Sequence, residues 1–282
     1  MSQSPDRAVT IAPEAVALTI AGSDPSGGAG LQADLKAFQQ NGVYGMAVVT
    51  LITVQNTRGV DRVELLPADL VNEQFDAVVG DITPRAIKTG ALGNASIIAE
   101  IAAKLGHVQC PVVVDPVMIS KHGVPLIDDA AIHAYRELML PRATLLTPNR
   151  FEAEHLLERE IGNEIDDLLQ ATEDLRDLGP AMVLLKAGEL NGEQMHTFLD
   201  SAQLLTIAVE RHATKHTHGA GCSLSATIAA QLALASPHEP IESNMRAAVE
   251  FGIAAVNHAI QFAPQYGHGS GPIESRMLHI GD

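Results

Sequence analysis

The sequence contains no tryptophan, and aromatic residues make up only 3% of its 282 positions. A folded core must therefore be built from Ala, Val, Ile and Leu, in a composition that is 46% hydrophobic. Aliphatic cores of this kind are typical of parallel sheets that are buried on both faces. The shortage of aromatic residues thus favours an α/β fold around a parallel sheet.

Cysteine is also scarce, since the chain has only Cys110 and Cys222. Two cysteines exclude a disulfide framework, and no cluster of Cys and His has the spacing of a zinc site. This cysteine usage indicates a reducing compartment, and we expect a cytoplasmic protein.

Basic residues are few: 18 Lys and Arg stand against 34 Asp and Glu, which gives a formal net charge of −16. Such a charge repels nucleic acid and anionic membrane surfaces alike, so we expect neither as a partner. An anionic ligand would need local backbone N–H groups, lysines and a divalent cation.

Long apolar runs are missing as well, because none approaches the roughly 20 residues that span a bilayer. The segment Met1–Pro13 lacks the features of a signal peptide. We therefore expect a soluble protein with a flexible tail at residues 1–13 and a single domain at residues 14–282.

Short β-type runs alternate with segments of helical period through most of the chain. This alternation predicts a mostly parallel central sheet with helices on both faces. The predicted pairs of strand and helix are Ala15–Ile20 with Leu31–Gln40, Ala86–Lys88 with Ala95–Leu105, Pro111–Val114 with Asp128–Leu140, and Thr144–Leu146 with Phe151–Glu158, followed by a strand at Ala181–Lys186.

Two predicted hairpins break the alternation. Met46–Val54 and Val60–Leu66 flank a turn, and Met195–Leu199 and Leu204–Val209 flank Asp200–Gln203. The first hairpin is a candidate β flap over a ligand site.

The first candidate motif runs from Ala21 to Gly30, between a predicted strand and a helix. Its glycines allow a ligand to approach the backbone closely. A Walker loop is excluded, because Gly28 and Ala29 stand where it requires Lys and Ser or Thr. The spacing from Gly28 to Ala33 fits a dinucleotide-binding loop, which keeps a nicotinamide oxidoreductase as an alternative. A plain tight turn is equally compatible, and Asp34 is either a helix-dipole partner or a substrate contact.

The second motif is the segment from Thr147 to Glu152, where a strand ends and a helix begins. Asn149 and Glu152 have the spacing of a capping box. The same glutamate could instead hold hydrated Mg²⁺ near phosphates. Both interpretations remain open at this stage.

The third motif runs from Thr217 to Ala226, where a pair of glycines leads into a long apolar helix. Free N–H groups at a helix start can bind a phosphoryl group. Cys222 lies in the first turn, where the helix N-terminus is expected to lower its pKa and make it a better proton acceptor. A small buried core residue is the alternative. His212, His216 and His218 have no carboxylate beside them in the sequence and are interpreted as polar loop residues.

Together these segments resemble the ribokinase-like superfamily, specifically its hydroxymethylpyrimidine/phosphomethylpyrimidine kinase branch. The resemblance extends from about Ala15 to Gly271 and rests on seven ordered segments: TIAGSDPSGGAGLQADLKAF, TVQNTRGV, KTGALG, VVVDPVM, TPNRFEAE, KHTHGAGCSLSATIAA and GHGSGP. It implies a kinase that uses ATP and Mg²⁺ to phosphorylate 4-amino-5-hydroxymethyl-2-methylpyrimidine, and then its monophosphate, in thiamine biosynthesis.

The resemblance also implies a role for each matching residue. Cys222 would be the catalytic base, and Gly219, Ala220 and Gly221 the anion hole. Gln55 would read the pyrimidine through its amide. The remaining expected site residues are Asp34, Ala29 and Val117 at the substrate, Lys186, Asn149 and Asp115 at the nucleotide, and Glu152 at the metal.

The sequence departs from the family pattern at several positions. Ala187 and Glu189 stand where Gly and His are usual, His122-Gly123-Val124 replaces a more usual Ser-Gly-Asp, and Ala91 stands where many members have Met. Alternative interpretations are therefore a pyridoxine or pyridoxal kinase and a non-catalytic vitamin-binding relative. We further expect a homodimer.

Overall fold

A computed structural model describes residues 15–119, 126–190 and 192–279. The tail predicted at residues 1–13 and the His122-Gly123-Val124 segment lie outside these ranges, and the single domain at residues 14–282 stays a prediction. The strands are β1 Val16–Ser23, β2 Tyr44–Asn56, β3 Gly59–Leu65, β4 Ala86–Thr89, β5 Val112–Val114, β6 Leu145–Leu146, β7 Met182–Leu190, β8 Glu193–Leu199 and β9 Leu204–Glu210. The α-helices are α1 Gly30–Gln40, α2 Ala68–Val79, α3 Ala95–Leu105, α4 Asp129–Ala134, α5 Arg150–Leu157, α6 Ile165–Asp177, α7 Ala220–Leu234 and α8 Ile241–Gln261.

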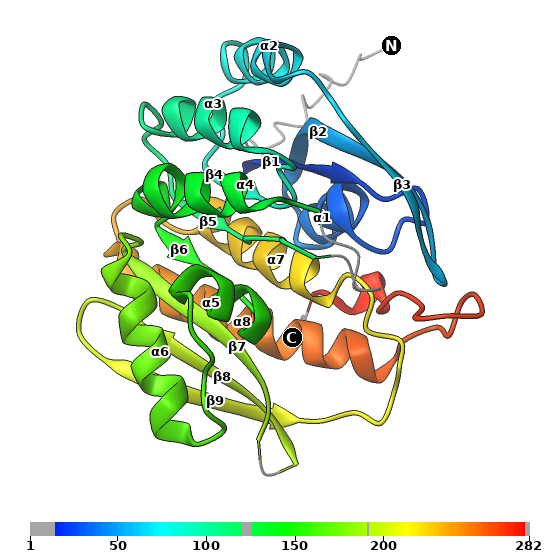
Figure 1. Cartoon of the computed structure of the whole chain (residues 1–282), viewed down its shortest axis with the longest axis vertical. Coiled ribbons are helices and arrows are strands. Elements are labelled where there is room, and N and C mark those ends of the chain that lie inside the picture. Colours follow the sequence, from blue (N-terminus) through cyan, green and yellow to red (C-terminus); the bar gives the residue numbers. More distant parts are fainter. Residues whose placement is uncertain (1–14, 120–125, 191, 280–282) are drawn as a thin grey trace, which may run out of the picture.

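The described strands form one nine-stranded sheet in the order β3-β2-β1-β4-β5-β6-β7-β8-β9 (Figure 1). The six central strands of this order, β2, β1, β4, β5, β6 and β7, pair in parallel. The hairpin strand β3 at one edge and the strands β8 and β9 at the other are antiparallel. This confirms the α/β class, the mostly parallel sheet and the β hairpin at residues 44–65.

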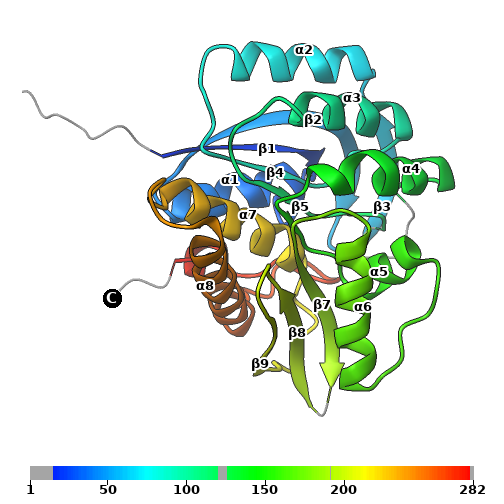
Figure 2. The ribbon, with the colours of Figure 1, turned by 90° about the vertical axis from the view of Figure 1, so that its left-hand side faces the viewer.

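Helices cover both faces of the sheet, because alternate residues of each central strand point to opposite sides. Figure 2 shows α1, α7 and α8 on one side and α3, α4, α5 and α6 on the other. Leu18 and Ile87 pack into the core on the side of α2 to α6, whereas their neighbours Ala17 and Ala86 pack with α1, α7 and α8. The aliphatic composition therefore fills two cores, one on each face.

One predicted helix, Asp128–Leu140, is divided in the structure. Only Asp129–Ala134 is α-helical, and a π-helical turn at Tyr135–Met139 and a 3₁₀ turn at Leu140–Arg142 follow it. Pro141 has no N–H group, so no α-helical hydrogen bond can form from it to the Glu137 carbonyl oxygen. Within the described residues, no helix is long and apolar enough to cross a membrane.

Candidate active site

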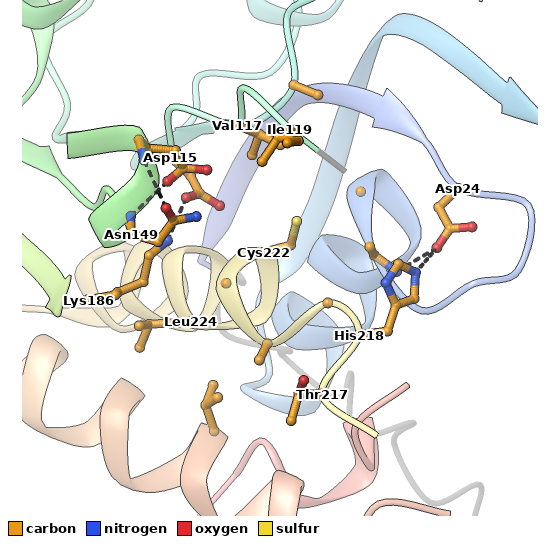
Figure 3. A pocket seen from close by; sticks show the side chains of 18 of the residues that line it. Asp24, Asp115, Val117, Ile119, Asn149, Lys186, Thr217, His218, Cys222 and Leu224 are labelled. Carbon is orange, nitrogen blue, oxygen red and sulfur yellow. Dashed lines mark hydrogen bonds and ion pairs between the residues drawn. The ribbon is translucent and has the colours of Figure 1, made fainter. Parts of the chain in front are cut away.

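A cavity of about 650 Å³ opens at the carboxyl ends of the parallel strands. Open α/β sheets bind their ligands at this edge, where the loops after successive strands meet. All three sequence motifs contribute to its lining, as do Gln55 of β2 and Lys186 of β7. Figure 3 shows Cys222 in the middle, with Asp115, Asn149 and Lys186 on one side and Asp24 and His218 on the other.

Helix α7 presents its N-terminus to this cavity. Gly219 occupies the N-cap position with φ 80° and provides no capping side chain. Ala220, Gly221 and Cys222 form the first turn and line the cavity. A Cβ at Gly221 would lie 3.3 Å from Lys186 Nζ, so the glycine brings the helix start close to a cation. The helix N-terminus at Gly221 and Cys222 thus lies beside an ammonium, which suits an anion, whereas the Ala220 N–H donates to the Thr217 carbonyl oxygen at 3.2 Å.

The first and third motifs are in close contact behind this point. A Cβ at Gly219 would lie 1.7 Å from the carbonyl oxygen of Gly28, and Gly30 adopts φ 55°. Neither position accepts another residue without movement of the backbone. The glycines therefore fix the helix start against the loop after β1.

The Cys222 thiol faces the cavity from this first turn. The Gly30 backbone N–H and the Lys88 ammonium lie near it, and both favour the thiolate. Burial raises the pKa of Cys222 to about 11, although the nearby Lys88 ammonium opposes that shift. The expectation of a lowered pKa was wrong, because desolvation outweighs the field of the helix start. At neutral pH the free protein carries a thiol here.

Asp115, Asn149, Glu152 and Lys186 gather on one side of Cys222. Lys186 Nζ lies 2.9 Å from Asp115 Oδ1. Burial lowers the pKa of Lys186, but the carboxylates of Asp115 and Glu152 outweigh burial and raise it, so the ammonium stays charged. The predicted nucleotide residues are thus brought together at the carboxyl ends of β5, β6 and β7.

Asn149 and Glu152 form the predicted capping box of α5. Asn149 Oδ1 accepts from the Glu152 N–H at 2.9 Å, and Glu152 Oε2 accepts from the Asn149 N–H at 2.7 Å. Burial raises the pKa of Glu152 to about 7, although Lys186 opposes the shift. The side chain is 3% exposed and lines the cavity, so its structural role does not exclude a ligand role.

The same side of the cavity fits a hydrated magnesium ion that arrives with a nucleotide. Mg²⁺ in phosphate sites is usually held by one or two carboxylates, with water and phosphate oxygens completing its shell. Asp115 and Glu152 offer two carboxylates beside the Lys186 ammonium. In the part of the chain that the structure describes, no group of three or more His, Cys, Asp or Glu residues could hold a metal alone.

Asp34 does not line the cavity, contrary to the sequence-based expectation. Its carboxylate lies 2.8 Å from Lys88 Nζ and accepts from Thr19 Oγ1 at 2.6 Å, and both charged side chains are fully buried. Burial lowers the pKa of Lys88, but Asp34 outweighs burial and raises it. Asp34 therefore pairs with the charged Lys88, which lines the cavity.

His218, Asp24 and Gln55 form the polar group on the other side of Cys222. His218 Nε2 lies 2.8 Å from Asp24 Oδ2 and 3.2 Å from Gln55 Nε2. Burial raises the pKa of Asp24, but hydrogen bonds with His218 and Ser26 outweigh burial and lower it, so the carboxylate is ionised. Asp24 was not predicted as a site residue, because its only signal in the sequence is its place before Pro25 in a glycine-rich turn.

The three histidines lie in the connection between β9 and α7, as predicted, but His216 and His218 are buried, and His218 has a carboxylate partner. His218 is 2% exposed and His216 is 8% exposed, and His216 Nδ1 accepts from the Gly271 N–H at 3.1 Å. Their carboxylate and backbone partners are distant in the sequence and adjacent only in the fold. His212 pairs with Asn257 at 2.9 Å.

The remaining predicted site residues, Ala29 and Val117, line the cavity, and so does Ala91. Ala187 is buried in β7, at an irregularity in the pairing between β7 and β8. The residue with positive φ there is Gly188, at 91°, and not Ala187. The departure at Ala187 therefore causes no backbone strain. Glu189 pairs with Arg211 at 2.9 Å, which offsets its charge.

Comparisons with known proteins agree on one family. A family model described as phosphomethylpyrimidine kinase matches residues 24–274. A hydroxymethylpyrimidine/phosphomethylpyrimidine kinase of Synechococcus elongatus is 43% identical over 92% of this chain and 96% of its own length.

Solved structures resemble most of the chain. The phosphomethylpyrimidine kinase of Clostridium difficile is 38% identical, with a TM-score of 0.73, over 86% of this chain and 100% of that one. The pyridoxal kinase of Staphylococcus aureus in complex with AMP-PCP and pyridoxal is 32% identical, with a TM-score of 0.83, over 94% of each chain. The chain therefore belongs to the phosphomethylpyrimidine kinase family and is a phosphate-transferring enzyme.

Proposed function

We propose that this chain transfers the γ-phosphoryl group of ATP to the hydroxymethyl oxygen of 4-amino-5-hydroxymethyl-2-methylpyrimidine, and then phosphorylates the monophosphate, in thiamine biosynthesis. The observation that carries the proposal is the position of Cys222. Cys222 lies in the first turn of α7, whose N-cap residue has no capping side chain. Lys186 and its neighbouring carboxylates line the cavity on one side of Cys222, and the Gln55 amide lines it on the other. Donor and acceptor subsites thus flank one anion-binding point.

The nucleotide side is assigned to the cluster around Lys186. Its ammonium and the first-turn N–H groups of α7 would bind the phosphates, and Asp115, Glu152 and Asn149 would hold Mg²⁺ and its water. Magnesium bound there would offset the negative charge of the phosphates. The wall lined by Leu224, Ile253, Val256 and Ile260 is apolar and suits a purine ring. The S. aureus relative, which binds the ATP analogue AMP-PCP, supports this assignment.

The acceptor side is assigned to Gln55, Ala29 and Val117. The Gln55 amide has a donor and an acceptor, which match a ring nitrogen beside an exocyclic amine. Cys222 would take the hydroxymethyl proton as the oxygen forms its bond to the γ-phosphorus and the bond to ADP breaks. Gly219, Ala220 and Gly221 would stabilise the phosphoryl oxygens during transfer.

A pyridoxal kinase is the second candidate. The S. aureus pyridoxal kinase is close in structure over 94% of this chain. Ala91 lines the cavity with a small side chain where many family members have Met, which leaves more room for a substrate ring. The higher identity of 43% to a hydroxymethylpyrimidine/phosphomethylpyrimidine kinase favours the pyrimidine.

The test is product formation. Purified protein is incubated with the aminopyrimidine and ATP, with and without Mg²⁺, and mono- and diphosphate products are followed by mass spectrometry. Both products are expected only with Mg²⁺. Absence of any pyrimidine phosphate from an enzyme that consumes ATP with pyridoxal would overturn the proposal in favour of the second candidate.

A further inference from the structure

Asp24 organises the loop after β1 and at the same time contacts a residue 194 positions away. Its carboxylate accepts from the Ser26 and Ala29 N–H groups, each at 2.9 Å, and from Ser26 Oγ at 3.0 Å. His218 Nε2 lies 2.8 Å from the same carboxylate, and both side chains are almost fully buried. The lowered pKa of Asp24 makes it an acceptor only.

The proton on His218 Nε2 follows from this contact. A carboxylate cannot donate, so a hydrogen bond at 2.8 Å requires the hydrogen to be on Nε2. This holds whether or not the second ring nitrogen is also protonated. His218 Nε2 therefore cannot accept a hydrogen bond from Gln55, whose amide nitrogen lies 3.2 Å away and is also a donor.

Thr53 contacts the other end of the Gln55 amide. Its hydroxyl has one hydrogen, which is donated to the Ser23 carbonyl oxygen at 3.0 Å, since a carbonyl can only accept. Thr53 Oγ1 can then only accept from Gln55, whose amide oxygen lies 3.3 Å away. Donor faces donor at one end of the amide and acceptor faces acceptor at the other. A half-turn of the amide removes both conflicts: Gln55 Nε2 then donates to Thr53 Oγ1, and Gln55 Oε1 shares the single Nε2 hydrogen of His218 with Asp24 in a three-centre hydrogen bond.

We propose that Asp24 and His218 are positioning residues that fix the Gln55 amide with Oε1 toward His218 and Nε2 toward Thr53. The free lone pair of Oε1 and the second N–H of Nε2 then stand in a set order along the cavity wall. This order decides which way round a ring with a nitrogen beside an amine can bind. The inference rests on the proposed function, since it concerns how the same site selects its substrate.

The first test needs no turnover. Protein labelled with ¹⁵N-histidine gives ring signals for all 12 histidines, and those of His218 are the ones lost in a His218→Gln variant. We expect Nε2 of His218 to have the chemical shift and one-bond coupling of a protonated nitrogen. A bare Nε2 overturns the inference, whatever the enzyme phosphorylates.

The second test uses a matched pair of variants and the ratio of kcat/KM for the aminopyrimidine to that for pyridoxal. His218→Gln keeps an N–H donor at the same reach, and His218→Met has the same length without one. We expect the ratio to fall roughly tenfold in the Met variant, mainly through KM, and to be largely retained in the Gln variant. Equal ratios in the two variants would contradict a positioning role.

A double-mutant cycle shows whether His218 acts through Gln55. In a Gln55→Met background, the Gln and Met variants at position 218 should give the same ratio, because there is no amide left to orient. Additive losses would overturn the inference. His216→Gln is the control, since His216 is buried in the same connection and bonds to Gly271 instead. If the wild type phosphorylates neither substrate, the proposed function fails and the NMR measurement alone decides the inference.

Discussion

The protonated thiol of Cys222 has a direct kinetic consequence. If Cys222 is the general base, its thiolate is the active form, and the thiolate fraction grows as pH rises toward the pKa of about 11. We expect kcat/KM to rise by about tenfold per pH unit from neutral pH and to level off near that pKa. Cys222→Ala should lose about 10²–10⁴-fold in rate.

Cys222→Asp provides the matched comparison. An aspartate is ionised well below neutral pH, so part of the rate should return and the acidic limb of the pH profile should move downward. Stopped assays across pH with mass-spectrometric detection measure both effects. A flat wild-type profile together with full activity in Cys222→Ala would show that the helix start acts through its N–H groups alone.

The buried pair of Lys88 and Asp34 predicts a stability effect. In the wild type, Lys88 Nζ lies 2.8 Å from the Asp34 carboxylate, and both side chains are fully buried. Lys88→Met leaves this carboxylate without its counter-ion. Removing one partner of a buried pair costs about 3–5 kcal/mol. Urea unfolding should show this loss, and Lys88→Met with Asp34→Leu should recover much of it. A loss under 1 kcal/mol would mean that the pair is solvated.

Some site residues could be predicted from the sequence because their signal is local. Cys222 follows a glycine pair in a helix start, and Asn149 and Glu152 have cap spacing. Asp24 and His218 could not be paired in this way, because their contact joins positions 194 apart. For the same reason Asp34 was assigned to the substrate, since nothing in the sequence places Lys88 beside it.

At the scale of elements, a substitution in the capping box of α5 can distinguish the structural role of Glu152 from a role in metal binding. Glu152→Gln keeps an acceptor for the Asn149 N–H, since Gln also closes capping boxes, but removes the charge. We expect the melting temperature to change little, the Mg²⁺ concentration needed for half-maximal rate to rise, and kcat to fall. A lower melting temperature with an unchanged Mg²⁺ requirement would leave Glu152 a purely structural role.

The contact between the α7 start and the loop after β1 predicts a second effect at this scale. Gly219→Ala would place a Cβ 1.7 Å from the Gly28 carbonyl at φ 80°. Gly192 has φ 86° with nothing within 4 Å of its Cβ position, so Gly192→Ala measures backbone strain alone. That strain costs about 1–3 kcal/mol. Denaturant unfolding should show a larger loss for Gly219→Ala, together with lost activity; equal losses would mean that the contact is not tight.

Elements with strong periodicity were predictable, and weakly patterned ones were not. The helix predicted at Ala95–Leu105 is confirmed as α3. It was predictable because its isoleucines repeat along one face. Helices α2 and α6 were not identified. In α6 only Leu168, Ala171, Thr172 and Leu175 are buried among many charged residues, so the apolar stripe is narrow. Strand β7 extends past Lys186 to Leu190 because β8 pairs with it, which no local pattern indicates.

At the scale of the whole molecule, the alternation of strands and helices predicted the fold class but not the order of the strands. Strand β1 pairs with both β2 and β4, and the chain then proceeds outward to β9. That order depends on long-range packing of the helices on each face. It brings the ends of β1, β2, β5, β6 and β7 to one edge, which is why motifs far apart in the sequence line a single cavity.

The most direct test of the central claim is a competition between acceptors in one reaction. The wild-type protein receives MgATP with equal concentrations of the aminopyrimidine and pyridoxal, and early products are quantified by mass spectrometry, so their ratio reports the ratio of kcat/KM directly. We expect pyrimidine monophosphate to form first and in excess, followed by the diphosphate. Pyridoxal phosphate in excess, with no pyrimidine diphosphate at long times, would contradict it.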